Sequence, residues 1–341
     1  MSETEKDVER QCREFRQMFE SLRREIGKVI VGHEGIVDNV LISLFCGGHV
    51  LLEGVPGLGK TLLVRTLSAA LTLEFRRIQF TPDLMPADII GTNIIMEDRT
   101  TGKRQFQFQR GPIFGQVILA DEINRATPKT QSAMLEAMQE HSVTTGGQIH
   151  KLPEPFIVLA TQNPIEQEGT YPLPEAQLDR FFFKVLVPYS NREELGMILD
   201  RTTTAKSPQA KAIIGTEQII ASQELVKRVA VAAHVQDYAI RLVLATHPDG
   251  EYASEITNRF IRYGSSPRGV QALVLSAKVR AMLDERYHIS FSDVNDSVLP
   301  ALRHRILLNF EGQAEGIQND DILNQILQDT PKTLEKNINV P

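Results

Sequence analysis

A glycine-rich segment constrains this chain more than any other feature, because Gly54-Val55-Pro56-Gly57-Leu58-Gly59-Lys60-Thr61 has the spacing G-x-x-x-x-G-K-[ST]. The apolar residues 49–53 before it predict a buried strand, and residues 62–71 after it predict a helix. Glycines let the backbone turn tightly and aim successive N–H groups inward, and the N-terminus of a helix attracts anions. The order of strand, glycine loop and helix therefore predicts a phosphate-binding loop.

The side chains at the end of this loop predict nucleotide chemistry. In such a loop, Lys60 reaches the β- and γ-phosphates and the Thr61 hydroxyl binds Mg²⁺. The alternative is a chance match in an ordinary turn, and the flanking strand and helix count against it. The residues predicted to contact the nucleotide here are Gly54, Val55, Pro56, Gly57, Leu58, Gly59, Lys60, Thr61 and Leu62.

The composition limits the number of domains, the class of partner and the cellular location. The chain has 341 residues, 42% of them hydrophobic, which suits two domains or one large one. Its net charge of −6 argues against nucleic acid as the main partner. Cys12 and Cys46 form no motif, no apolar run approaches the ~20 residues of a membrane span, and the charged N-terminus has no signal-peptide core. We therefore expect a soluble, cytoplasmic protein.

An acidic pair ends the next strongly apolar strand, residues 116–122. In phosphate-loop enzymes a carboxylate at this place holds Mg²⁺ through its water shell, opposite the loop hydroxyl. Asp121 fits that role together with Thr61, and Glu122 is placed to polarise a water for attack on the γ-phosphate. The alternative is a surface acidic pair.

Asn163 lies at the end of a further predicted strand, residues 156–164, which is apolar on both faces as a central parallel strand should be. Ligands bind beyond the carboxyl ends of parallel strands, so Asn163 should reach the same site. Its amide can orient the attacking water together with Glu122. An Asn before a Pro is otherwise a common turn residue.

The remaining pattern divides the chain into an α/β part and a helical part. Residues 93–110 and 142–152 predict hairpins. The first hairpin mixes basic and aromatic residues, and we leave open whether it touches a polymer substrate or is simply solvated. An apolar stripe along 4–30 favours a helix packed on the next domain over a dimer zipper. We predict an α/β domain over 1–188, a helical one over 189–330, with helices at 192–201, 222–235, 237–246, 267–284 and 293–309, and a loosely held tail over 331–341.

Taken together, these pieces resemble the AAA+ ATPases, and most closely the MoxR family of the helix-2-insert clade. The resemblance covers about residues 29–310 and shows no departure at a nucleotide-contacting position. The motifs that carry it are the loop at 54–61, LADEINRA at 119–126, LATQNP at 159–164, YPLPEAQLDRF at 171–181 and SPRG at 266–269.

The resemblance implies a fold and a set of roles. The fold is a five-stranded parallel sheet of order 5-1-4-3-2 with helices around it, followed by a C-terminal all-helical lid. The hairpin at 93–110 resembles the insertion in helix 2, and that at 142–152 resembles the hairpin before sensor 1. The implied residues are Asn163 as sensor 1, Arg268 as the sensor-2 arginine on the γ-phosphate, Arg180 as a finger offered to the neighbouring subunit, Val31 and Gly32 in the adenine pocket, and Arg125 as a rival trans-acting arginine. A local salt bridge is the alternative for Arg180, and a surface position for Arg268.

The resemblance also implies an activity and partners. It implies a Mg²⁺-dependent ATPase in a homo-oligomeric, hexameric ring that remodels or matures a protein client, in the manner of a chaperone or for metal insertion, with a von Willebrand factor A domain partner. Rival functions are a DNA-translocating motor of the same clade, a metal-chelatase motor subunit and a nucleotide-gated binding module. The acidic net charge counts against the first rival, and the intact Glu122, Asn163 and Arg180 count against the last.

Overall fold

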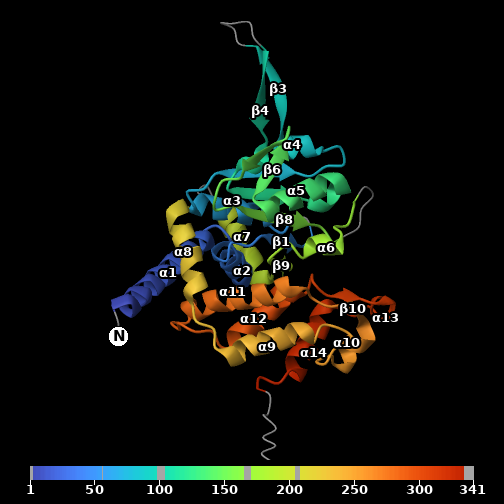
Figure 1. Ribbon diagram of the computed structural model, residues 1–341. Helices are drawn as coiled ribbons and strands as arrows, with labels where there is room; N and C mark the ends of the chain where they lie inside the picture. The colour runs from blue at the N-terminus through green and yellow to red at the C-terminus, as the bar shows by residue number, and fades with distance from the viewer. Residues whose placement is uncertain (1–2, 56, 98–103, 165–169, 204–207, 334–341) are drawn as a thin grey trace, which may run out of the picture. The chain divides into compact units, whose positions relative to one another are not determined.

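The computed structural model describes residues 3–55, 57–97, 104–164, 170–203 and 208–333 (Figure 1). Contacts divide the chain into two compact units. The first, here the α/β unit, comprises Gln17–Phe181 and Val185–Ser222, and the second, the helical unit, comprises the chain up to Arg16, Phe182–Lys184 and the chain from Gln223 on. The sequence placed a domain boundary at 188, whereas the contacts group 189–222 with the α/β unit.

The α/β unit is built on a parallel sheet. Its strands β1, β8, β5 and β2 pair side by side in parallel, and β9 follows β1 at the other edge. The observed order β2-β5-β8-β1-β9 is the predicted order 5-1-4-3-2 seen from the opposite edge, so that prediction is confirmed. All residues of β5 are buried, which explains its continuous apolar run. The strands are β1 (Val50–Glu53), β2 (Phe75–Gln79), β5 (Val117–Asp121), β8 (Ile157–Gln162) and β9 (Phe183–Leu186).

Helices surround this sheet because their apolar faces have a strand surface to cover. In one core cluster, Met134 and Met138 of α5 pack with Ile118 of β5, all of them almost fully buried. The apolar stripe of α1 is buried within this chain at Phe19 and Leu22, as a packed helix requires. The elements are α1 (Glu3–Gly27), α2 (Glu34–Phe45), α3 (Lys60–Ala70), α4 (Pro86–Ile90), α5 (Pro128–Glu140), α6 (Glu175–Leu178), α7 (Arg192–Thr202), α8 (Thr216–Arg228) and the 3₁₀ turns η1 (Pro112–Phe114) and η2 (Ile123–Arg125).

Two antiparallel hairpins interrupt the alternation of strands and helices. One pairs β3 (Gly91–Glu97) with β4 (Arg104–Arg110) and extends away from the sheet (Figure 1). The other pairs β6 (Ser142–Thr145) with β7 (Gln148–Lys151). Phe108 of β4 stacks on His150 of β7 with ring centroids 4.1 Å apart, so the hairpins support one another.

The helical unit packs short helices around α11 and α12. A two-stranded antiparallel sheet of β10 and β11 also lies here, and the sequence pattern did not predict it. Strands of three and two residues are too short to show a periodicity of two. The elements are α9 (Ala233–Leu244), α10 (Glu255–Phe260), β10 (Ile261–Tyr263), α11 (Pro267–Leu283), α12 (Phe291–Leu302), β11 (Leu307–Leu308), α13 (Phe310–Ala314) and α14 (Asn319–Asp329).

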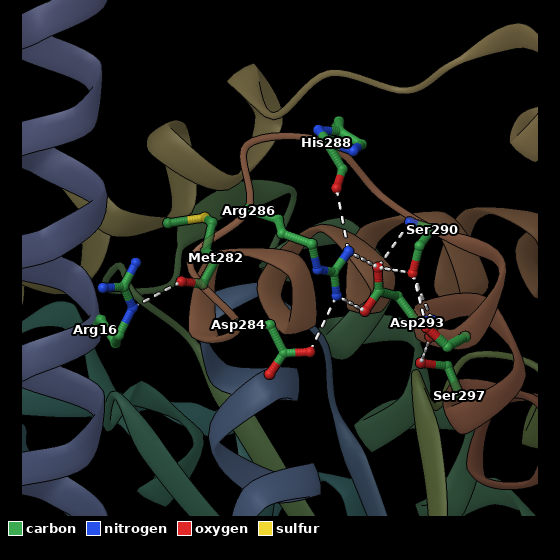
Figure 2. A network of polar contacts seen from close by, with 9 residues as sticks. Arg16, Met282, Asp284, Arg286, His288, Ser290, Asp293 and Ser297 are labelled. Atoms are coloured by element: carbon green, nitrogen blue, oxygen red, sulfur yellow. Dashed lines mark hydrogen bonds and ion pairs between the residues drawn. The ribbon is translucent and has the colours of Figure 1, made fainter.

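A polar network fastens the turn between α11 and α12 (Figure 2). The Arg286 guanidinium donates to both carboxylate oxygens of Asp293, at 2.6 and 2.7 Å. Asp293 Oδ2 also accepts from the backbone N–H and the hydroxyl of Ser290, which caps α12. Burial acts to raise the pKa of Asp293, but the hydrogen bonds from Arg286 and Ser290 outweigh it and the pKa is lowered.

Both cysteines are free thiols, with Cys12 buried and Cys46 half-buried. Among the described residues, no helix combines the length and the apolar character needed to cross a membrane.

Candidate nucleotide site

The phosphate-binding loop lies at the carboxyl end of β1, where a tight turn leads into α3. A Cβ added to Gly54 would lie 2.7 Å from the carbonyl oxygen of Val187, so only glycine fits there. Gly57 and Gly59 have φ angles of +87° and +78°, which glycine adopts without the steric cost of a side chain. Pro56 lies outside the described residues. The glycines thus lie at positions where a side chain would clash or would strain the backbone.

Lys60 opens α3 and folds back over the loop. Its ammonium group donates to the carbonyl oxygens of Gly54 and Val55. Burial lowers the pKa of Lys60, while the carboxylates of Asp121 and Glu122 act to raise it. A three-donor cation on a flexible stem can exchange carbonyl oxygens for phosphate oxygens.

Asp121 ends β5 beside the loop and is 7% exposed. Its Oδ2 accepts from the Thr61 hydroxyl at 3.4 Å, and its Oδ1 accepts from the Thr161 hydroxyl at 2.7 Å. Thr61 and Asp121 offer oxygen atoms only, which is the ligand type that Mg²⁺ prefers, so these residues fit the ion. Among the described residues, no cluster of three His, Cys, Asp or Glu side chains could hold a metal alone.

Glu122 follows in a left-handed backbone conformation, φ +56°, that turns the chain sharply at the end of β5. Its backbone N–H donates to the Thr161 hydroxyl at 2.8 Å. Its carboxylate accepts from the Gln79 amide at 3.1 Å and from the Arg125 guanidinium at 2.9 Å. The predicted general base is thus held by three neighbours.

Sequence reasoning missed Arg77, Gln79 and Thr161, although all three touch the acidic pair. Arg77 and Gln79 belong to β2, in which Gln79 is the register partner of Asp121. Thr161 belongs to β8 on the other side of β5. The predicted strand order places β2 and β8 next to β5, so polar residues near the ends of those strands were the available signal.

A pocket of about 380 Å³ adjoins the loop within the α/β unit. Gly57 to Lys60, the segment 29–31 and residues of α7 line it. Val31 is 7% exposed, and among the described residues no hydrogen bond uses its backbone N–H or carbonyl. Gly32 does not line this pocket; the Glu194 carboxylate lies over its α-carbon, and its φ is +64°.

The other predicted residues are dispersed. Asn163 follows β8, and its carbonyl accepts from the Asn124 amide at 3.3 Å. Arg180 lies between α6 and β9 and is half-buried; among the described residues its guanidinium forms no ion pair. Arg268 lies in the first turn of α11, where its N–H donates to the Ser266 hydroxyl at 3.1 Å. Arg268 belongs to the helical unit, and its role on the γ-phosphate stays a prediction.

Comparison with known proteins identifies the family. The model of the ATPase family associated with various cellular activities (AAA) matches residues 49–183, and that of the AAA lid domain matches residues 253–326. Chaperone MoxR1 of Mycobacterium tuberculosis is 42% identical over 89% of this chain and 79% of its own length. The chain belongs to the MoxR family of AAA ATPases.

Two further comparisons agree with this assignment. Protein MoxR of Methylorubrum extorquens is 29% identical over 86% of this chain and 89% of its own length. A crystal structure of a Cytophaga hutchinsonii protein, to which an ATPase function has been assigned, superimposes on this chain with a TM-score of 0.88. The two chains are 40% identical, and the match covers 97% of this chain and 99% of that one. This MoxR-type, chaperone-like AAA ATPase thus has its α/β fold and C-terminal helical lid in common with its relatives.

Proposed function

We propose that this MoxR-family ATPase binds Mg²⁺-ATP at the loop between β1 and α3 and hydrolyses it with Glu122 as the base. One observation carries the proposal: Lys60, Thr61 and the Asp121–Glu122 pair converge at the carboxyl edge of one sheet. The adjoining pocket at Val31 supports a place for the adenine. Among the described residues, the N–H and carbonyl of Val31 form no hydrogen bond, and they match an edge with one acceptor and one donor.

Different residues would have different roles in the binding and hydrolysis of ATP. Lys60 and the loop N–H groups would bind the phosphates, and Thr61 with Asp121 would hold the hydrated metal. Mg²⁺, when bound, neutralises charge on the transferring phosphoryl group. Glu122 accepts the proton of the attacking water, and the donors on its carboxylate and backbone keep it aimed. Asn163 would orient that water from β8.

Replacement of the base tests this assignment. Glu122→Gln should bind ATP and hydrolyse it at least ~100-fold more slowly, because the amide cannot take a proton. Lys60→Ala should instead lose ATP affinity. The exposed Glu140 at the end of α5 provides a control, and Glu140→Gln should behave as the wild type. Normal turnover in Glu122→Gln, with labelled ATP still bound, would move the catalytic role elsewhere.

We further propose that the protein works as a homo-oligomeric ring, a hexamer in keeping with the family resemblance, in which Arg180 serves the neighbour's ATP. Arg180 is half-buried between α6 and β9, and it forms no ion pair with the described residues. Such fingers contribute about 10³–10⁵ in rate elsewhere. Mixing Arg180→Ala with Lys60→Ala should restore part of the activity that each lacks. Absence of recovery in subunits shown to exchange would mean that Arg180 acts within its own subunit or that the ring tolerates no inactive site. Arg125→Ala provides the rival variant.

The client side of the proposal rests on the hairpin of β3 and β4. Phe106 is 78% exposed and Ile95, its register partner, is 60% exposed, so one face offers apolar side chains to another molecule. We propose that this face contacts a protein client in the cytoplasm. The family resemblance adds chaperone-like maturation, metal insertion and a von Willebrand factor A domain partner. Phe106→Ala should keep basal ATPase activity and lose stimulation by that client.

A further inference from the structure

Arg77 is the charged residue of the nucleotide site that the proposed chemistry leaves without a role. It projects from β2 toward the end of β5, where its Nη2 and Nε donate to Asp121 Oδ2 at 2.6 and 3.1 Å. The Arg77 side chain is 48% exposed, whereas that of Asp121 is 10% exposed. A half-exposed cation therefore covers the least exposed acid of the site.

The bonds of Arg77 fall on the oxygen that also faces the phosphate-binding loop. Asp121 Oδ2 accepts from the Thr61 hydroxyl at 3.4 Å in addition to the two Arg77 donors, whereas Oδ1 is occupied by Thr161. A carboxylate oxygen has two lone pairs. The water shell of a Mg²⁺ ion held by Thr61 would need a lone pair of Asp121 Oδ2. Arg77 and the hydrated ion would therefore compete for the same acceptor atom.

We propose that Arg77 is a displaceable counter-ion of Asp121. It neutralises the carboxylate in the absence of metal and gives up Oδ2 when Mg²⁺ arrives with the nucleotide. The inference rests on the proposed function, because it assumes that Asp121 is the metal-site carboxylate.

The structure also offers Arg77 another partner. Nη2 donates to Gln79 Oε1 at 2.5 Å, and the Gln79 amide in turn donates to Glu122. Arg77 can therefore release Asp121 and keep a hydrogen bond within β2. Because Arg77 is half exposed, water can hydrate the freed donors, and the free-energy cost of displacing Arg77 from Asp121 is small.

A positioning role for Arg77 predicts the opposite result. If the guanidinium only held Asp121 in the right orientation, its loss would weaken the metal site. If it competes with the metal, its loss should strengthen the coupling between Mg²⁺ and nucleotide. The sign of the change decides between the two roles.

The experiment measures equilibrium binding of a fluorescent ATP analogue, first in EDTA and then across a Mg²⁺ titration. The compared proteins are the wild type, Arg77→Gln, Arg77→Lys and Arg76→Gln. Arg76 is the matched control, because it is the adjacent arginine of β2 and pairs with the exposed Glu74 instead of the site. The ratio of the two dissociation constants, without and with Mg²⁺, cancels any general loss of positive charge.

In Arg77→Gln this ratio should rise about fivefold, on the scale of a partly exposed ion pair. Binding in EDTA should weaken because an uncompensated Asp121 repels the phosphates, and half-saturation should need less Mg²⁺. Arg77→Lys should return binding in EDTA toward the wild type, and Arg76→Gln should change neither quantity. A ratio that falls or stays constant in a folded Arg77→Gln protein overturns the inference.

Asp121→Asn separates this inference from the proposed function. If Asp121 holds the metal, the substitution should collapse the ratio toward one. If Asp121→Asn leaves the ratio intact, the metal assignment itself fails. If Asp121→Asn collapses the ratio while Arg77→Gln does not raise it, only the role of Arg77 fails.

Discussion

The nucleotide site and the α11–α12 turn each place an arginine on a buried aspartate, yet the two pairs are built differently. Arg286 engages both oxygens of Asp293, and Ser290 adds two donors, so the carboxylate is fully satisfied (Figure 2). Arg77 engages one oxygen of Asp121, which faces the Thr61 hydroxyl. The exposed fraction of the arginine side chain is 28% for Arg286 and 48% for Arg77. We expect the complete, shielded fork to contribute mainly to stability, and the one-sided, half-exposed contact to leave Asp121 free for the metal-site role proposed above.

The largest effect should come from breaking the complete pair. Arg286→Gln should lower the free energy of unfolding by about 3–5 kcal/mol, because it leaves the charge of a nearly fully buried carboxylate without its cation. Denaturant unfolding followed by circular dichroism measures this loss. Arg259→Gln is the matched control, since Arg259 pairs with Glu311 and Glu315 at an exposed surface of the same unit and should lose only a small part of that amount. Equal losses in the two variants would contradict a special role for the fork.

The two units should also differ in the pH at which they lose stability. In the α/β unit, His49 is buried. It donates from Nε2 to the Met138 carbonyl and accepts from the Val158 N–H at Nδ1, which fixes a neutral ring. Burial lowers its pKa from 6.5 to about 4. Below pH 6.5 the unfolded chain binds a proton at His49, whereas the folded chain binds it only near pH 4. The free energy of unfolding therefore decreases as the pH is lowered from 6.5 to about 4.

For His49 the expected loss is about 2–3 kcal/mol between pH 7 and pH 4.5. Unfolding curves at the two pH values measure it, and His49→Gln should lose much of the difference. The Arg286–Asp293 pair follows a lower window. The lowered pKa of Asp293 means that its contribution is complete above about pH 4 and is lost only as the pH falls through the folded pKa. A wild-type pH dependence that persists in His49→Gln would assign it to other groups.

The phosphate-binding loop and the central strands were predictable from the residues themselves, because their causes are local, whereas the order of the strands was implied by the family resemblance. The glycine spacing sets a backbone conformation, and an apolar run on both faces identifies a central strand. The contacts that hold Glu122 were not predictable in the same way. Thr161 and Gln79 reach Glu122 only because β8 and β2 flank β5 in a particular register, and a one-residue slip would turn those side chains to the other face.

Boundaries in the second half of the chain were the least predictable. A helix predicted at 222–235 is α8 over Thr216–Arg228, followed by a break before α9 begins at Ala233. The side chain of Gln218 accepts from the Gly215 N–H at the start of α8, a contact that residue spacing does not signal. The roles of Arg180 and Arg268 depend on parts of the molecule whose relation no local pattern encodes, so they stay predictions.

Thr161 links the two acids of the nucleotide site and should have an intermediate effect. Thr161→Val removes the donor to Asp121 and the acceptor of the Glu122 N–H while keeping the side-chain volume. We expect kcat to fall about tenfold with a smaller change in ATP affinity, since a hydrogen bond to a charged group contributes about 1.5–3 kcal/mol. Thr161→Ser should restore most of kcat. A variant with wild-type kcat would show that Glu122 is aimed by its other partners alone.

The smallest effect should come from the one-sided pair. Arg77→Gln should change the free energy of unfolding by less than about 1 kcal/mol in metal-free buffer, because a half-exposed guanidinium gains little over its hydrated state. Asp121 should tolerate the loss because Thr161 and Thr61 still donate to it. The measurement is the same denaturant titration used for Arg286→Gln, so the two arginine substitutions are compared directly. A loss for Arg77→Gln as large as that for Arg286→Gln would mean that Arg77 is part of the structural framework, and a cation fixed in that way could not yield Asp121 to a metal.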